Sequence, residues 1–272
     1  NFLKRCADEN SDYSILLMNT GINENYEKAE KILKKIIKFE NEDEINIYTK
    51  NSVRSGLYQF YIYKRNYDEA EKYIYEAVTL LKGTNQRETY YENLRKLYKV
   101  FIARGQSFEA KKGLKNLILE IEDNFGSESI QLIEPISDYI NLLTSNLDHT
   151  NDNEEYAARL IKILKENKKY KINNPYAYAS LGAYYYRIEK FNLSEKFFEK
   201  SLEYKKYRKS QVEILLAQIK IELEKYKEAE KIISKFEHKN SHEKMLLMFA
   251  NARLSHKTKN IQQYQRDFIN NK

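Results

Sequence analysis

The sequence is poor in residues that break helices and in residues that carry redox chemistry. Its 272 residues include seven glycines, two prolines, one cysteine and no tryptophan. Few glycines and prolines favour long helices, and the single cysteine, Cys6, excludes an internal disulfide. No apolar run approaches the roughly 20 residues of a membrane-spanning helix, and no secretory signal pattern is visible. We therefore expect a mostly helical protein in the cytoplasm.

Motifs that carry catalysis or bind metals are also missing. The sequence contains no HExxH, no GxSxG, no glycine-rich phosphate loop and no pair of thiolates. Two histidines, His238 and His242, are four residues apart, but they flank a polar break and have no clear third ligand. We therefore expect no enzymatic activity, no metal and no cofactor.

The charge is basic but evenly mixed. The chain has 47 Lys and Arg against 40 Asp and Glu, a formal net charge of +7. Acids and bases alternate at helical spacings, as in Glu27, Lys28, Glu30 and Lys31, which is typical of solvated helix faces. No basic run reaches five or six like charges. We therefore do not expect a nucleic-acid partner. An RNA-binding repeat stays open as a third interpretation and predicts a continuous basic stripe.

A pattern of small, aromatic and bulky residues recurs along the chain. It is clearest at 178–202, where a polar break separates two amphipathic segments. The second segments centre on a small residue, at Ala29, Ala70, Ala110, Ser194 and Ala229, with a weaker match at Ala157. Most have an aromatic three positions earlier (Tyr26, Tyr67, Phe191, Tyr226) and a bulky residue four positions later (Leu33, Ile74, Leu114, Phe198, Ile233). The small residue allows two helices to cross closely, and the resulting pairs must stack to bury their apolar stripes.

The first segments carry a pattern of their own. Leu181 and Gly182 are followed by an aromatic, Tyr185, three residues after the glycine. The same pattern recurs with the glycine enlarged to tyrosine at Leu57, Tyr58 and Tyr61, and at Leu97, Tyr98 and Phe101. Together these features resemble the tetratricopeptide repeat (TPR) family, whose period is about 34 residues. The resemblance implies an all-α, right-handed superhelical solenoid of about seven antiparallel helix pairs.

We predict a single TPR-like domain over residues 1–272. Its helix pairs are expected near 10–40, 51–82, 91–124, 132–168, 175–206, 210–240 and 242–272. Asparagine stands at several junctions, which we interpret as a substitute for glycine in left-handed backbone, at Asn25, Asn66, Asn124, Asn167 and Asn240.

The resemblance also implies a binding groove lined by the first helices of successive pairs. Transferring the inward-facing positions of the family gives Gln59, Tyr63, Arg95, Lys99, Tyr176, Tyr186, Arg187, Gln218 and Arg253. Arg95 and Lys99 are four residues apart and share a helix face, so they could bind a carboxylate or phosphate. Tyr176 and Tyr186 could supply flat amphipathic contact area.

The resemblance therefore favours a non-catalytic scaffold that binds another protein or a peptide in the groove. The alternative is the sensor part of a peptide-responsive regulator, which binds a signalling peptide and acts on a DNA-binding or phosphatase partner. A groove that closes around a peptide would favour the receptor, and an open, flat or convex contact would favour the scaffold.

Overall fold

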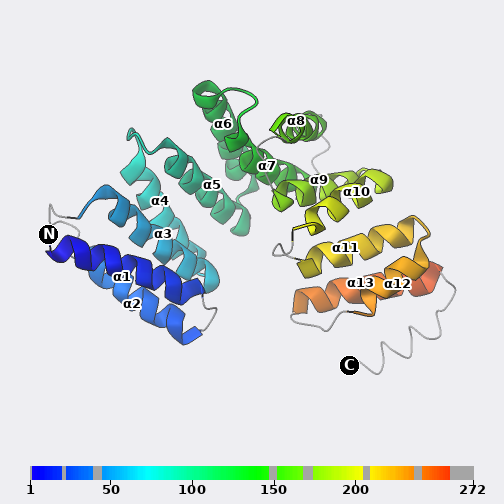
Figure 1. Ribbon diagram of the computed structural model, residues 1–272, viewed down its shortest axis with the longest axis horizontal. Coiled ribbons are helices and arrows are strands. Elements are labelled where there is room, and N and C mark those ends of the chain that lie inside the picture. The colour runs from blue at the N-terminus through cyan, green and yellow to red at the C-terminus, as the bar shows by residue number, and fades with distance from the viewer. Residues whose placement is uncertain are drawn as a thin grey trace. The chain divides into compact units, whose positions relative to one another are not determined.

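The computed structural model describes residues 2–19, 23–38, 45–146, 152–167, 174–204, 209–235 and 241–257. Within these ranges the chain is almost entirely helical and contains no strand (Figure 1). The α-helices are α1 (Phe2–Asn19), α2 (Asn23–Lys38), α3 (Ile47–Tyr63), α4 (Tyr67–Leu81), α5 (Arg87–Ala103), α6 (Ser107–Phe125), α7 (Ile133–Ser145), α8 (Asp152–Glu166), α9 (Pro175–Arg187), α10 (Phe191–Leu202), α11 (Lys209–Glu222), α12 (Tyr226–Ile233) and α13 (Ser241–Lys257). A short 3₁₀ helix, η1 (Ile130–Leu132), precedes α7.

Successive helices form antiparallel pairs, so the predicted all-α fold of helix pairs is confirmed. The chain divides into two compact units, Asn1–Asn124 and Phe125–Lys272. Unit 1 contains the pairs α1/α2, α3/α4 and α5/α6, and unit 2 contains α7/α8, α9/α10, α11/α12 and then α13. The end of the seventh predicted pair, residues 258–272, lies outside the described residues.

Four turns between the helices of a pair share one backbone geometry. Each places a residue with positive φ two positions after the last residue of the first helix, at Arg65 (55°), Gly105 (78°), Glu189 (58°) and Glu224 (60°). The N–H of the next residue then bonds to a carbonyl five residues earlier, as from Asn66 to Tyr61 (2.9 Å) and from Lys190 to Tyr185 (2.9 Å). This bond satisfies carbonyls at the helix end and reverses the chain within a few residues.

The interpretation of the asparagines as left-handed residues is wrong where the structure describes them. Asn66 has a φ of −90°, and its side chain accepts a hydrogen bond from the N–H of Glu69, so it caps the start of α4. Asn25 and Asn124 lie inside α2 and α6, and Asn167 follows α8 without positive φ. Asn240 lies outside the described residues. Asparagine is a strong N-cap residue, and at position 66 this preference decides its role.

Glu189→Gly is expected to raise the free energy of unfolding by about 0.5–1 kcal/mol. Left-handed backbone costs an L-residue about 1–2 kcal/mol, and glycine removes this cost. Glycine also loses more conformational entropy on folding, which cancels part of the gain. Urea unfolding followed by circular dichroism measures the change. Glu189→Ala keeps a Cβ and should leave stability unchanged. An equal gain in both variants would show that the Glu189 side chain, not its backbone, causes the strain.

The small residues of the repeat lie where the helices of a pair cross. Ala29, Ala70, Ala110, Ala157, Ser194 and Ala229 are all buried. At the crossing of α9 and α10, the Ser194 hydroxyl donates to the carbonyl of Gly182 at 2.7 Å. The Phe198 ring fills the space over Gly182, where a Cβ would come within 2.9 Å of three ring atoms. In this pair the large side chain is therefore on α10, and the glycine that makes room for it is on α9.

In the third pair the large side chain is on the first helix and the glycine that faces it is on the second helix. Tyr98 of α5 occupies the position of the family's glycine, and Gly113 of α6 lies against its ring. A Cβ on Gly113 would overlap the ring carbons of Tyr98. Burial, together with the nearby Tyr90 and Glu120, raises the pKa of Tyr98 to about 12. The enlarged residue is therefore accommodated by a glycine on the facing helix.

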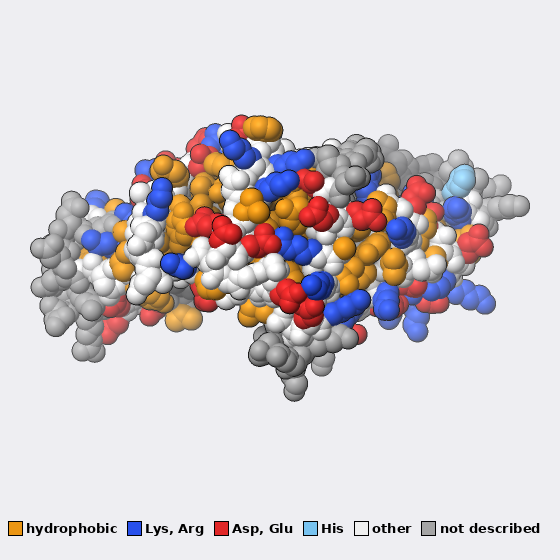
Figure 2. Space-filling model, turned by 90° about the horizontal axis from the view of Figure 1, so that it is seen from above, with side chains coloured by type: hydrophobic (Ala, Val, Ile, Leu, Met, Phe, Trp, Pro, Cys, Tyr) orange, Lys and Arg blue, Asp and Glu red, His pale blue; other side chains and the backbone are white. Residues whose placement is uncertain are grey.

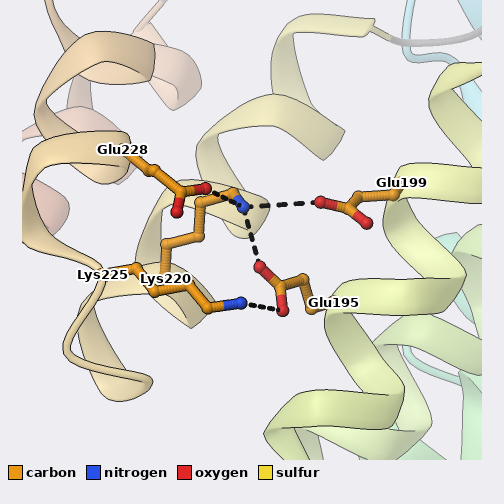
Figure 3. Close-up of polar contacts among 5 residues, drawn as sticks. All are labelled: Glu195, Glu199, Lys220, Lys225 and Glu228. Carbon is orange, nitrogen blue, oxygen red and sulfur yellow. Dashed lines mark hydrogen bonds and ion pairs between the residues drawn. The ribbon is translucent and has the colours of Figure 1, made fainter.

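An ion cluster joins the fifth and sixth pairs (Figure 3). Lys220 Nζ on α11 lies 2.7 Å from Glu195 Oε1, 3.4 Å from Glu199 Oε1 and 2.7 Å from Glu228 Oε2. Lys225 Nζ, at the start of α12, lies 2.6 Å from Glu195 Oε2. Burial acts against ionisation of Glu195, but hydrogen bonds from Lys220 and Lys225 outweigh it and hold the pKa of Glu195 below its usual value. Three helices are thereby bonded through one lysine.

Candidate binding surface on the first helices

In unit 1, polar side chains connect the first helices of neighbouring pairs. The hydroxyls of Ser11 on α1 and Ser52 on α3 are 2.8 Å apart, and Thr49 donates to Asp8 between the same helices. Between α3 and α5, the buried amide of Asn93 donates to Asn51 Oδ1 at 2.7 Å. Hydrogen bonds depend on direction, so these contacts set the register of one first helix against the next.

In unit 2 a similar set of contacts connects α7 to α9. Asn141 Nδ2 donates to the Tyr176 hydroxyl at 3.0 Å and to Ser180 Oγ at 2.9 Å. The Tyr176 hydroxyl in turn donates to the buried carboxylate of Asp138. Tyr176 is therefore held by α7, with its hydroxyl in a polar network.

Two predicted groove residues that are 67 positions apart meet directly in unit 2. Arg253 Nη1 on α13 donates to the Tyr186 hydroxyl on α9 at 2.7 Å. The same guanidinium lies 3.2 Å, through Nε, from Glu222 Oε1 at the end of α11. The first helices of the fifth, sixth and seventh pairs therefore contribute to one surface. We call Tyr186, Glu222 and Arg253 the arginine cluster.

In unit 1 the predicted residues on α3 are exposed. The Gln59 side chain is open to solvent. Tyr63 is 45% exposed, and its ring stacks on Tyr26 of α2 with centroids 4.0 Å apart and an interplanar angle of 9°. Lys64 lies 5.9 Å from the centroid of Tyr63 and forms an ion pair with Glu27. Tyr63 is thus partly covered by Tyr26 and Lys64, and its exposed remainder is open to a ligand.

The remaining predicted residues differ in how accessible they are. Arg95 has a side chain only 13% exposed, and its Nη1 lies 3.0 Å from Glu92 on the same helix. Lys99 is half-buried on α5, and Gln218 is buried in α11. Arg187 is exposed at the end of α9. The structure thus brings Tyr186 and Arg253 together, but it leaves little of Arg95 and Gln218 open to a ligand.

Charges and possible metal ligands give no sign of another kind of site in the part of the chain that the structure describes. Figure 2 shows acidic and basic side chains interspersed on the visible face, rather than gathered in a basic stripe. No group of three or more His, Cys, Asp or Glu side chains among the described residues could hold a metal. His238 lies outside the described residues. No described helix is both long and apolar enough to cross a bilayer.

Solved structures with the same arrangement of helices cover nearly the whole chain. One is a signal transduction ATPase with numerous domains (STAND) with a tetratricopeptide repeat sensor from Pyrococcus horikoshii, at a TM-score of 0.64 and 17% identity. The match covers 91% of this chain and 38% of that one. The chain has the tetratricopeptide repeat fold. No family model matches its sequence, and no curated protein matches it, which is consistent with TPR units that are degenerate in sequence.

Two further TPR-like neighbours match over most of both chains. The apo form of RapI has a TM-score of 0.60 at 11% identity, with 98% of this chain and 87% of that chain covered. A Rap protein complexed with Competence and Sporulation Factor has a TM-score of 0.60 at 12% identity, with coverages of 97% and 87%. At such low identities the similarity shows that this chain shares their fold, and it does not identify a ligand.

Several residues of the TPR surface were not predicted from the sequence, namely Asp138, Asn141, Ser180, Glu222, Asn51 and Asn93. A signal for the unit 1 contacts was present. Ser11 and Ser52 are 41 positions apart, and so are Thr49 and Asp8. The repeat marks Ala29 and Ala70 have the same separation, since 70 − 29 = 41. Polar residues at equivalent positions of successive repeats therefore meet between the first helices.

Proposed function

We propose that the first helices of each unit form a non-catalytic surface that binds another protein or a peptide. The observation that carries the proposal is the hydrogen bond between Arg253 and Tyr186, two predicted groove positions from the seventh and fifth pairs. Such a bond requires both side chains to lie on one face of unit 2. The polar contacts between first helices hold this face in place before a ligand arrives, which lowers the entropy lost on binding.

Site-specific photocrosslinking tests which face binds. A benzophenone amino acid is placed at Gln59 and at Phe249, which are exposed on the first helices α3 and α13. Matched controls carry it at Tyr75 and Leu193, which are exposed on the second helices α4 and α10. We expect crosslinks to a polypeptide from the first-helix positions in native lysate. Crosslinks confined to Tyr75 and Leu193 would contradict the proposal, and crosslinks to RNA would support the RNA-binding alternative.

A regulator that senses a peptide is the second candidate. It is supported by the likeness to a Rap protein complexed with Competence and Sporulation Factor, which extends over 97% of this chain. In this case the first helices bind a short signalling peptide, and a DNA-binding or phosphatase partner responds. Mass spectrometry of the crosslinked species separates the candidates, because the scaffold yields a large protein and the receptor yields a short peptide.

A further inference from the structure

The arginine cluster contains a guanidinium that is fixed in place but still half open to solvent. Arg253 is 50% exposed in its side chain, against 16% for Glu222. A guanidinium carries five N–H donors, and the contacts to Tyr186 and Glu222 engage only two of its nitrogens. Donors therefore remain for a ligand on a group whose orientation is already set by two neighbouring helices.

The surroundings of this guanidinium combine positive charge with apolar surface. Lys257 follows Arg253 by four positions and is exposed on the same face of α13. Phe249 precedes Arg253 by four positions and is 61% exposed. Glu222 is the one acid bonded to Arg253 among the described residues. An anionic group with an apolar neighbour is complementary to this face.

We propose that the arginine cluster is a subsite for a carboxylate of a peptide ligand, with an adjacent apolar side chain of the ligand resting on Phe249. The proposal deepens the proposed function and rests on it. Arg253 would bind the carboxylate by charge-assisted hydrogen bonds, which are among the stronger ones in proteins. Tyr186 and Glu222 act as positioning residues, because each bonds to the guanidinium from a different helix.

Substitutions of Arg253 and of its partner Glu222 are expected to affect affinity in opposite ways. Arg253→Gln removes the charge that binds the ligand, so it should weaken binding. Glu222→Gln retains a hydrogen-bond acceptor for the Nε–H but removes the negative charge that competes with the ligand, so it should strengthen binding. A purely structural ion pair predicts that both variants lose affinity together.

The test begins with a random peptide library displayed against the whole chain. Peptides enriched by the wild type are synthesised with a fluorescent label, and their dissociation constants are measured by anisotropy. For Arg253→Gln we expect a loss of about tenfold or more, the range for hydrogen bonds to charged groups. For Glu222→Gln we expect a gain of a few fold. Arg104→Gln is the matched control, because Arg104, at the turn between α5 and α6, is likewise held by two side chains, Asp68 and Glu71 of α4.

Variants of the peptide identify the source of the carboxylate. Amidation of the C-terminus, or replacement of a side-chain acid by its amide, should each remove the effect of Arg253→Gln if that carboxylate is the one bound. Peptides that bind without any effect of Arg253→Gln would overturn the subsite and leave the proposed function standing. Equal losses in Arg253→Gln and Glu222→Gln would overturn it as well. Failure to select any peptide would overturn the subsite, and the crosslinking from Gln59 and Phe249 would then still test the proposed function separately.

Discussion

Lys220→Ala is expected to lower the free energy of unfolding by about 3–5 kcal/mol, the range for removing one partner of a buried ion pair. Lys220 is 8% exposed and bonds to three glutamates on two helices (Figure 3). Without it, Glu195, itself 10% exposed, keeps only Lys225 and faces the charges of Glu199 and Glu228. Urea unfolding followed by circular dichroism measures the loss.

Two control variants separate the buried charge from general damage to the interface. Lys225→Ala removes a lysine that is 39% exposed, and we expect it to cost much less. Lys220→Met combined with Glu195→Leu replaces both charges by apolar groups and should recover most of the stability. A double variant that is as unstable as Lys220→Ala would show that shape, not charge, determines the effect.

The cluster also predicts a dependence on pH with a definite sign. The pKa of Glu195 is lower in the folded chain than in the unfolded chain. Its contribution to stability is therefore complete above the usual glutamate pKa and is lost as the pH falls through the lowered value. In the Lys220→Met/Glu195→Leu variant this acid-dependent part should be smaller.

Gly113→Leu is expected to lower the free energy of unfolding by about 1–3 kcal/mol or more, the usual cost of overpacking a well-packed site. Even a Cβ at Gly113 would overlap the ring carbons of Tyr98. The better helix propensity of leucine, worth up to about 1 kcal/mol over glycine, opposes this cost but does not remove the overlap. Thermal and urea unfolding of the two proteins measure the change.

Matched variants show whether the effects of Gly113 and Tyr98 on stability are coupled. Lys112→Leu introduces the same side chain at the exposed neighbouring position of α6 and should be close to neutral. Tyr98→Ala combined with Gly113→Leu moves the bulk from α5 to α6, as Gly182 and Phe198 have it in the fifth pair, and should recover part of the loss. Additive losses in the double variant would contradict the coupling of the two sites.

Some features of the candidate surface could be predicted because the resemblance to the TPR family implies which positions of each repeat face inward. Tyr186 and Arg253 were placed in the groove from their positions in the repeat, and the structure brings their side chains into contact. Accessibility was harder to predict. Arg95 shares a helix face with Lys99, but the nearby Glu92 and the packing of α5 leave only 13% of its side chain exposed.

The polar contacts between first helices could not be predicted from the spacing of residues within one helix. Asn141 and Asp138 lie in the fourth pair, whose repeat pattern is degenerate, so no alignment placed them opposite Tyr176. Asn66 illustrates the same limit within a turn. Its residue type suits both left-handed backbone and an N-cap, and only the bonded geometry of the turn gives the left-handed position to Arg65 instead.

The sequence by itself determined the helical class, the pairing of helices and the positions of the crossings, because these depend on periodicity, on scarce glycine and proline, and on small residues at regular places. Only the tertiary structure decided which helix of a pair carries the bulky residue, as at Gly113 and Tyr98, and which charges are buried, as at Lys220. The physical reason is that packing volume and charge pairing are properties of two or more helices together. Several side chains are compatible with the same position of one helix, and packing and charge pairing with the neighbouring helix decide which of them is stable there.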